Sequence, residues 1–183
     1  MKKEELEKLT TWDKIFNFIF EAEGEYSNDP SDRGGETAWG ITKKFLEDLK
    51  EDLKIDKIDQ QTAKKLYKKF FSKYNLDKIS KPSIRFFVCD CAILLGPHRA
   101  VSIAQRVCNE IGIEIKVDGV CGPRTLAALA VVDVKKFLRI ATWRVVEFHI
   151  NTALASWDQK RFLRGWINRA NRRQATALEM ADE

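Results

Sequence analysis

The sequence predicts an all-α protein built from several helices, with an irregular loop or small hairpin after the first helix. Apolar residues recur every three or four positions through most of the chain, which is typical of helices. Clusters of Gly, Pro, Asn and Asp separate these periodic stretches, and no long alternation of apolar and polar residues indicates a strand. With 183 residues, 44% of them hydrophobic and 32% charged, the chain can form one compact domain or two packed lobes.

The first periodic segment covers residues 11–23. Gly24 predicts the end of this helix. Residues 25–40 are rich in turn formers and lack a helical period, so they predict the loop or small hairpin. Apolar residues and one glutamate share a single face of the first helix, at positions i, i+3, i+4, i+7 and i+11: Trp12, Ile15, Phe16, Ile19 and Glu23.

Further helices follow along the chain, and residues 111–122 are expected to form a turn or short hairpin between two of them. The second helix begins near Thr42, which suits an N-cap. The third helix has an apolar inner face made of Ala63, Leu66, Tyr67, Phe70 and Phe71. From the third onward, the helices cover about residues 59–74, 82–95, 97–110, 124–130 and 133–154, and the last runs from about Trp157 into the tail.

The net charge of +5 and the pI of about 9.0 favour polyanionic partners. Nucleic acid, an acidic wall polymer and an anionic membrane surface all fit, and the charge does not choose among them. Lysine dominates residues 43–81 and arginine dominates residues 139–173. Both runs are also typical of solvated helix faces.

The N-terminal residues, Met1 to Thr10, carry both charges and lack the apolar segment of a secretory signal. Apolar runs such as Cys91 to Leu95 are too short to span a bilayer. We therefore expect synthesis in the cytoplasm without an N-terminal signal peptide, export by another route, and no insertion into a membrane.

The four cysteines, Cys89, Cys91, Cys108 and Cys121, do not have zinc-ribbon spacing, and only two histidines accompany them. We expect no metal and no cofactor. The cysteines are interpreted as reduced, partly buried thiols that pack as small apolar residues. One disulfide remains open as an alternative if the protein works outside the cytosol. His98 and His149 are interpreted as structural residues.

Glu23 is the acidic residue on the apolar face of the first helix. This position predicts a carboxyl group at the edge of the core, where partial burial disfavours the charged form and raises the pKa. A general acid that protonates a glycosidic oxygen needs such a group. Alternatively, Glu23 only closes the helix end, either exposed or paired with a basic side chain.

The loop after this helix contains further polar side chains, namely Asp29, Asp32, Glu36 and Thr37. Its glycines permit a close approach between backbone and ligand. Glycoside cleavage needs at least two carboxyl groups, one to donate a proton and one to place water or stabilise positive charge. Asp29 and Asp32 also suit turn capping, as in an Asn-Asp-Pro turn, so both interpretations stay open.

Residues 23–42 contain an ordered series of short motifs that resembles the signature of glycoside hydrolase family 108. The family pattern is Glu-Gly-Gly-Tyr, then Asn-Asp-Pro, then Asp-x-Gly-Gly-x-Thr, then Gly-Ile-Thr. Members of this family are N-acetylmuramidases, often described as secretion activator proteins or found as phage endolysins. The spacing is also similar to the Glu–Asp–Thr triad of phage-type lysozymes. The matching residues are Glu23-Gly24-Glu25-Tyr26, Asn28-Asp29-Pro30, Asp32-Arg33-Gly34-Gly35-Glu36-Thr37 and Gly40-Ile41-Thr42.

The resemblance implies a lysozyme-like fold and a role for individual residues. Glu23 would be the catalytic acid, Asp32 would stabilise positive charge, and Thr37 would position water or the aspartate. Glu25 departs from the pattern, because the family has a second glycine there. Its side chain would disturb the turn or add negative charge that raises the pKa of Glu23. The residues expected to bind substrate in this segment are Tyr26, Asn28, Asp29, Gly35, Trp39 and Gly40.

The second half of the chain resembles the predicted peptidoglycan-binding region of the same family. Residues 118–126 are similar to the pattern Asp-Gly-x-x-Gly-Pro-x-Thr, and Ala104-Gln105 and residues 162–169 fit the same region. On this resemblance, residues 1–80 form the catalytic region and residues 81–183 the binding region, packed together as one compact unit. Asp118 and Trp166 are expected to bind substrate. For Trp166 the alternative is core packing, and for the nearby arginines it is a solvated face.

The leading hypothesis is a monomeric N-acetylmuramidase that hydrolyses the β-1,4 bond between N-acetylmuramic acid and N-acetylglucosamine. Its partner would be the peptidoglycan glycan strand, which is anionic through its lactyl-peptide stems, and it would act at the cell wall after holin-like or other export. No nucleic acid is expected as a partner. The alternatives are a catalytically weak peptidoglycan-binding or secretion-assisting protein and, from the arginine-rich last helix, a nucleic-acid binder.

Overall fold

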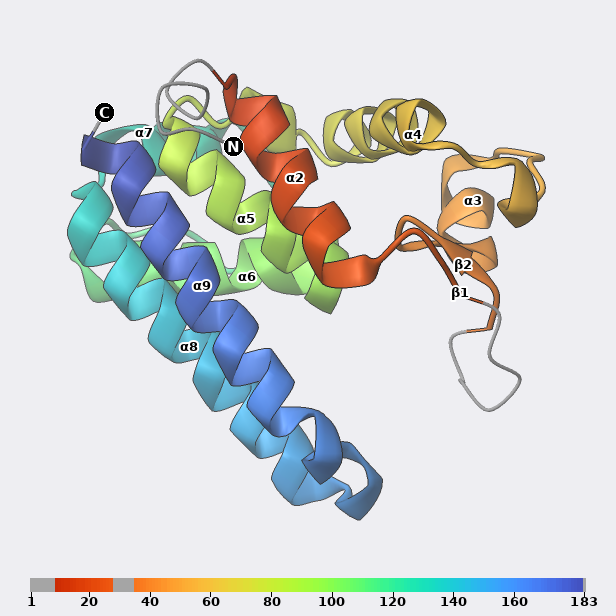
Figure 1. Ribbon diagram of the computed structural model, residues 1–183. Coiled ribbons are helices and arrows are strands. Elements are labelled where there is room, and N and C mark those ends of the chain that lie inside the picture. The colour runs from red at the N-terminus through yellow and green to blue at the C-terminus, as the bar shows by residue number, and fades with distance from the viewer. Residues whose placement is uncertain (1–8, 28–34, 183) are drawn as a thin grey trace. The chain divides into compact units, whose positions relative to one another are not determined.

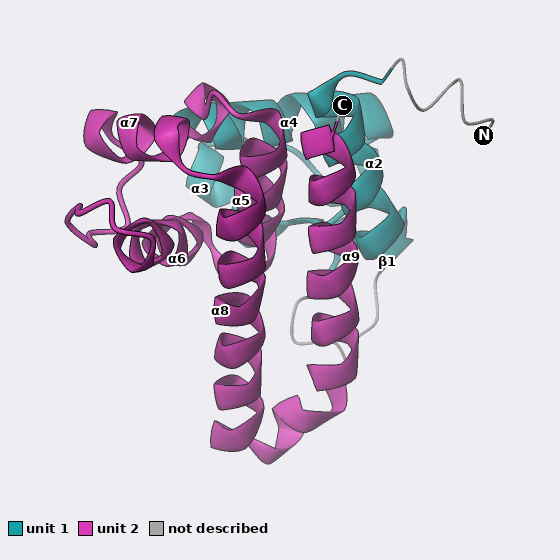
Figure 2. Cartoon of the chain, turned by 90° about the vertical axis from the view of Figure 1, so that its left-hand side faces the viewer, with its two compact units in different colours: residues 1–73 teal, residues 74–183 magenta. Residues whose placement is uncertain are grey.

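The computed structural model describes residues 9–27 and 35–182. The chain divides into two compact units, Met1–Lys73 and Tyr74–Glu183, which Figure 2 shows in different colours. Helices dominate both units, and the strands in the described residues form one small sheet (Figure 1). The predicted all-α, lysozyme-like class is confirmed. The division into functional regions at residues 80 and 81 stays a prediction, since the compact units meet between Lys73 and Tyr74.

The first unit begins with α2 (Thr11–Glu23), which has the predicted bounds. A capping box starts it: Thr10 Oγ1 accepts a hydrogen bond from the Asp13 backbone, and the Asp13 carboxylate accepts one from the Thr10 backbone. Gly24 ends it at a φ of 76°, with its N–H donating to the Phe20 carbonyl over 3.1 Å. The buried face is wider than predicted and consists of Ile15, Phe16, Phe18, Ile19 and Phe20.

A three-stranded antiparallel sheet follows α2, in the order β1 (Tyr26–Ser27), β2 (Thr37–Ala38) and β3 (Ile41–Thr42). Thr37 lies opposite Ser27 on one side and opposite Thr42 on the other. The predicted loop or small hairpin is therefore extended by a third strand. Trp39 and Gly40 make this possible, because both have positive φ (54° and 77°) and form a two-residue turn between β2 and β3.

Two helices complete the first unit: α3 (Lys43–Leu49) and, after the short 3₁₀ turn η1 (Ile55–Lys57), α4 (Gln60–Lys73). Thr42 caps α3 as predicted, because its Oγ1 accepts a hydrogen bond from the Phe45 backbone over 3.1 Å. The predicted inner face of α4 is buried. Aromatic side chains of these elements form much of the core: Trp12, Phe16, Phe20, Trp39, Phe45, Tyr67, Phe70 and Phe71.

The second unit is built around α5, which packs against α6 and α9. The long helices α8 and α9 lie side by side and are joined by η3 (Figures 1 and 2). Asp133 caps α8 as predicted, accepting from the Lys136 backbone over 2.7 Å. In chain order the elements are η2 (Leu76–Lys78), α5 (Pro82–Leu95), α6 (Pro97–Glu110), α7 (Pro123–Val131), α8 (Val134–Ala155), η3 (Trp157–Phe162) and α9 (Leu163–Asp182).

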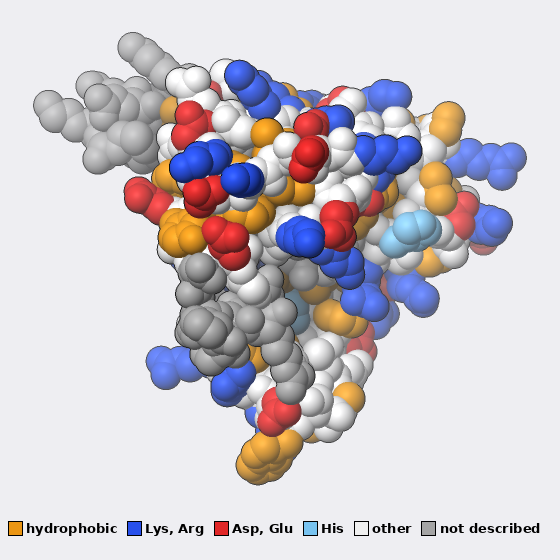
Figure 3. Space-filling view, turned by 90° about the vertical axis from the view of Figure 1, so that its right-hand side faces the viewer, with side chains coloured by type: hydrophobic (Ala, Val, Ile, Leu, Met, Phe, Trp, Pro, Cys, Tyr) orange, Lys and Arg blue, Asp and Glu red, His pale blue; other side chains and the backbone are white. Residues whose placement is uncertain are grey.

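The last helix differs from its prediction at its start. Residues Trp157–Phe162 form a 3₁₀ helix without a buried residue, and α9 begins only at Leu163. Leu154, Trp157 and Phe162 are exposed by 72%, 81% and 43% at this end of the α8–α9 pair. Figure 3 shows exposed apolar side-chain surface at the same end. Trp157 therefore contributes little to the core, and the Lys160 ammonium lies 4.1 Å from its ring centroid.

All four cysteines lie in the second unit, buried and free of disulfides, as their interpretation as small apolar residues predicted. Burial raises the pKa of the Cys91 thiol to about 12, and that of Cys108 and Cys121 to about 11. It also raises the pKa of Cys89 well above its ordinary value. These thiols are consequently neutral at physiological pH.

Candidate active site

Glu23 is the last residue of α2, and its side chain is exposed. The predicted partial burial at the edge of the core is therefore wrong. The reason is the position of the core along the helix: burial ends at Phe20, and Glu21, Ala22 and Glu23 are exposed. Helical spacing predicts the direction in which a side chain points, but not whether the core still reaches that turn.

The aliphatic part of the Glu23 side chain lies against the backbone of Gly40. A Cβ placed at residue 40 would be 2.8 Å from Glu23 Cγ and 2.7 Å from the Tyr67 hydroxyl oxygen. Both distances are shorter than van der Waals contact, and the φ of 77° at Gly40 also disfavours any other residue. Gly40 therefore brings the end of α2, the turn between β2 and β3, and α4 into direct contact.

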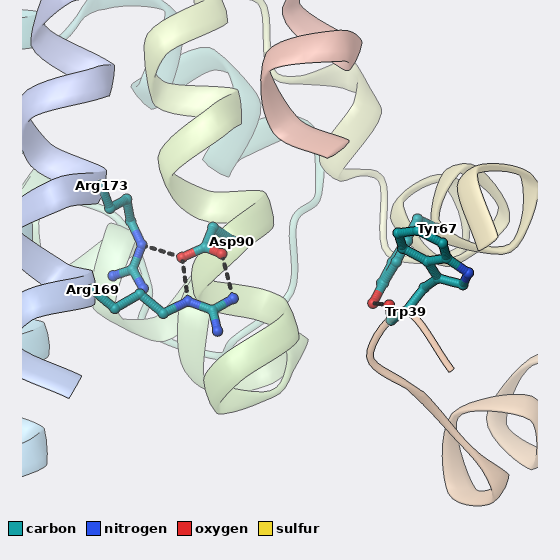
Figure 4. Close-up of polar contacts among 5 residues, drawn as sticks. All are labelled: Trp39, Tyr67, Asp90, Arg169 and Arg173. Carbon is teal, nitrogen blue, oxygen red and sulfur yellow. Dashed lines mark hydrogen bonds and ion pairs between the residues drawn. The ribbon is translucent and has the colours of Figure 1, made fainter. Parts of the chain in front are cut away.

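The Trp39–Gly40 turn is held from three directions. The Trp39 N–H donates to the Glu25 carbonyl over 2.8 Å, and the Tyr67 hydroxyl donates to the Trp39 carbonyl over 2.8 Å (Figure 4). The Trp39 ring also meets the Phe20 ring edge-on, with centroids 5.0 Å apart. These contacts stabilise a left-handed conformation that tryptophan rarely adopts. Tyr67 was predicted only as a core residue, so its link to the turn was missed.

Other predicted site residues lie on or beside the small sheet. Tyr26 is exposed, and its hydroxyl donates to Glu36 Oε1 over 2.9 Å. Thr37 is half-buried on the central strand. Gly35 has a φ of 69° with open space where a Cβ would stand, so its conformation, and not a close contact, requires glycine. Asn28, Asp29 and Asp32 lie outside the described residues, and their roles stay predictions.

In the second unit, Asp118 belongs to a hydrogen-bonded turn centred on Gln105, which is 1% exposed. Gln105 Nε2 donates to Asp118 Oδ1 over 2.9 Å, and Gln105 Oε1 accepts from the backbone of Asp118 and Gly119. The hydrogen bonds from Gln105 and from the Val120 backbone lower the pKa of Asp118. These contacts give Asp118 a structural part in the turn before α7, and its substrate-binding role stays a prediction.

Trp166 on α9 is half-buried and stacks on His149 of α8, with ring centroids 4.9 Å apart. His149 is 2% exposed. Burial, followed by the charges of Arg173 and Arg169, lowers the pKa of His149 to about 4. The ring contact agrees with the packing alternative for Trp166, while binding of substrate by this residue stays a prediction.

Comparisons with known proteins support the resemblance found in the sequence. The profile of the glycosyl hydrolase 108 family matches residues 16–96, and the profile of a predicted peptidoglycan domain matches residues 99–171. Residues 16–96 of the chain are therefore similar to the glycosyl hydrolase 108 family. Among solved structures, SagA from Brucella abortus superimposes with a TM-score of 0.79 at 25% identity, covering 94% of this chain and 97% of SagA. A search of curated proteins gave no match.

The glycosyl hydrolase 108 match extends beyond the first compact unit and includes α5 of the second. Asp90 on α5 is 1% exposed and forms ion pairs with Arg169 (2.7 Å) and Arg173 (2.6 Å) of α9 (Figure 4). Burial alone would raise the pKa of Asp90, but the two guanidinium groups lower it overall. This triad fixes the last helix of the glycosidase match to the helix that ends the peptidoglycan-domain match.

Local sequence patterns did not predict this triad, although one signal was present. Asp90 is the single charged residue between Phe86 and Leu95, and a buried carboxylate needs a cationic partner. The arginine-rich last helix provides two. Because Arg173 is 0% exposed and Arg169 pairs with Asp90, these arginines do not form a solvated basic face for nucleic acid.

Within residues 9–27 and 35–182, no three His, Cys, Asp or Glu residues come together in a way that suits a metal ion. The described helices also include none that is long and apolar enough to cross a membrane.

Proposed function

We propose that the chain is an N-acetylmuramidase that acts on the cell wall, with Glu23 as its general acid. The match of residues 16–96 to the glycosyl hydrolase 108 profile supports a peptidoglycan-acting glycosidase, and the second profile supports peptidoglycan as the partner. The observation that carries the choice of Glu23 is its contact with Gly40. This contact fixes the side-chain stem while leaving the residue exposed to a ligand.

In the proposed reaction, the Glu23 carboxyl group donates its proton to the oxygen of the β-1,4 bond on the reducing side of N-acetylmuramic acid. The bond from that oxygen to the sugar breaks, and positive charge develops on the ring. A second carboxylate stabilises this charge or activates water, and Asp32 is the candidate that the motif provides. Thr37, on the central strand, would position the water or the aspartate. Water completes the hydrolysis and returns a proton to the site.

A bound glycan strand would desolvate the Glu23 carboxyl group, which the packing of α2 leaves exposed. The sugar rings would cover the exposed carboxyl group and exclude water from it, which favours its neutral, proton-donating form. Tyr26, Trp39 and the glycine backbone around Gly40 lie at the same end of α2 and on the adjoining sheet, where they would contact the strand.

Replacement of Glu23 with glutamine tests this proposal. Loss of a general acid is expected to lower the rate about 10²- to 10⁴-fold, whereas stability should stay within about 0.5 kcal/mol because the side chain is exposed. The assay measures reducing ends released from purified peptidoglycan, and mass spectrometry of the fragments identifies the bond. Glu21→Gln, two residues before Glu23 on the same exposed turn, is the matched control and should retain activity. Wall lysis by Glu23→Gln at the parental rate would contradict the assignment.

A catalytically weak peptidoglycan-binding protein is the second candidate function. Two observations favour it: Glu23 is exposed, and Glu25, also exposed, stands where the family has glycine. Such a protein would bind purified wall without releasing reducing ends. If Glu25 impairs the site, Glu25→Gly should raise the rate of reducing-end release, whereas the muramidase proposal expects substantial activity from the parent.

A further inference from the structure

The second unit contains a groove of about 830 Å³ between α6 and α8 that no predicted site residue lines. Its walls carry three arginines and two glutamates, a net charge of +1 with His98 neutral. One phenylalanine, two asparagines, a serine, an isoleucine and a valine complete the lining. The residues on which its recognition properties depend are Arg99, Arg106, Glu110, Arg144, Glu147 and Phe148.

Arg144 is held in the groove by ion pairs that neutralise its charge. Its Nε donates to Glu110 Oε1 and its Nη1 donates to Glu147 Oε2, both over 2.8 Å. These two carboxylates raise the pKa of Arg144. The three side chains thus form a rigid wall of both charges, able to face an ammonium group as well as a carboxylate.

Arg99 and Arg106 are the two groove arginines that could form ion pairs with a ligand. Both are exposed, and neither forms an ion pair with another described residue. The Arg99 guanidinium lies over the Phe148 ring, 4.6 Å from its centroid. Stacking orients the guanidinium plane without using its N–H donors, which are left to bind a carboxylate in bidentate geometry.

The same stacking argues against a sugar in this position. Carbohydrate binding would use an open aromatic face, but Arg99 covers one face of Phe148, and His149 meets its ring at 5.6 Å in an edge contact. A ligand with carboxylates spaced along a polar backbone fits better. In peptidoglycan this description applies to the peptide stems and not to the glycan.

We propose that the α6–α8 groove binds the peptide stems of peptidoglycan, with Arg99 and Arg106 contacting stem carboxylates. The inference rests on peptidoglycan as the proposed substrate, but not on the chemistry of Glu23. In this proposal the second unit binds the peptide part of the polymer, and the first unit binds and cleaves the glycan.

The test compares two soluble probes in calorimetric titrations of the full chain. One is the N-acetylglucosamine–N-acetylmuramic acid disaccharide carrying its tetrapeptide, and the other is the same disaccharide without peptide. The parent should bind the peptide-bearing probe at least about tenfold more tightly than the peptide-free disaccharide. This preference should weaken as the salt concentration rises, because salt screens the contacts between arginine and carboxylate. Equal binding of the two probes would overturn the proposal.

Charge-reversal variants test whether the peptide-bearing probe binds in the α6–α8 groove. Arg99→Glu and Arg106→Glu are each expected to weaken binding of the peptide-bearing probe about tenfold and to leave the disaccharide unaffected. Arg139→Glu, an exposed arginine of α8 outside the groove, makes the same charge change and should bind like the parent. Parental binding by both groove variants, or an equal loss in Arg139→Glu, would overturn the groove assignment.

The two proposals fail separately in these experiments. Glu23→Gln should lower the rate of cleavage about 10²- to 10⁴-fold but bind the peptide-bearing probe as the parent does. Groove variants should still release reducing ends from peptide-free glycan at the parental rate. A parent that binds the probe through the groove but never cleaves would refute the muramidase proposal alone.

Discussion

Glu23 in the first unit and Asp90 in the second are both acidic residues on apolar helices, yet their surroundings differ completely. Asp90 is 1% exposed and is held by two guanidinium groups at 2.6 and 2.7 Å. Glu23 is exposed, and its stem lies against the backbone of a glycine. Two guanidinium groups hold Asp90, and a close backbone contact positions the stem of Glu23.

The difference separates a buried acid in an ion-pair network from the exposed acid that is proposed as the general acid. A buried carboxylate between two arginines stays ionised and cannot donate a proton near neutral pH. An exposed carboxyl group whose stem lies against a glycine backbone can meet a ligand. The following variants test each side of this comparison.

Removal of the buried acid should have the largest effect on stability. Asp90→Ala leaves two arginines without their common partner and is expected to lower the free energy of unfolding by about 3–5 kcal/mol. Asp182→Ala removes an exposed partner of Lys135 and should cost less than about 1 kcal/mol. Urea denaturation measures both. A loss below about 1 kcal/mol in Asp90→Ala would show that the triad adds little to stability.

Disruption of the close contact between Gly40 and Glu23 should affect both activity and stability. Gly40→Ala places a methyl group against Glu23 and Tyr67 and is expected to cost about 2 kcal/mol and at least about tenfold in reducing-end release. Gly112→Ala is the matched control, since its φ is also positive (94°) but its surroundings are open. It should cost about 1 kcal/mol with full activity. Equal activity in the two variants would argue against the Gly40 contact as a positioning device.

Acidification should weaken the second unit through His149. Its pKa is about 4 in the folded chain against an ordinary value of 6.5. The unfolded chain therefore binds more protons in this range, and stability is complete above pH 6.5 and falls as the pH decreases toward 4. The loss should be about 2 kcal/mol. Urea midpoints between pH 7 and pH 4.5 measure it, and His149→Gln should flatten the profile. Asp90, whose pKa is lowered, contributes only at still lower pH.

Loss of the Tyr67 hydroxyl should have the smallest effect. Tyr67→Phe removes one hydrogen bond to the Trp39 carbonyl and is expected to cost about 1 kcal/mol, with a few-fold loss of activity. Tyr26→Phe removes an exposed hydrogen bond to Glu36 and should cost less than about 0.5 kcal/mol. A Tyr67→Phe variant with parental stability and rate would show that the other contacts suffice to hold the turn.

Local patterns in the sequence predicted most of the helices because their causes are local. Thr42 and Asp133 have N-cap side chains, Gly24 ends a helix with positive φ, and α4 shows its buried face at helical spacing. The third strand was missed because it depends on tryptophan adopting a left-handed conformation, which the Phe20 and Tyr67 contacts stabilise.

The candidate site could be predicted only in part, for the same reason. The motifs indicate which residues belong together, and the structure adds the Glu23–Gly40 contact to them. The exposure of Glu23 could not be predicted, because it depends on where the core ends. The Asp90–Arg169 and Asp90–Arg173 pairs join residues about eighty positions apart, and no local pattern specifies such pairing.

The burial of the four neutral thiols has a consequence for where the chain can fold. No cross-link contributes to the second unit, so a reducing and an oxidising compartment should yield the same native state. Thiolate is the species that exchanges disulfides, and it is scarce when thiol pKa values are about 11 to 12. Reaction of these thiols with glutathione or with an oxidant would therefore require local opening of the helices that bury them.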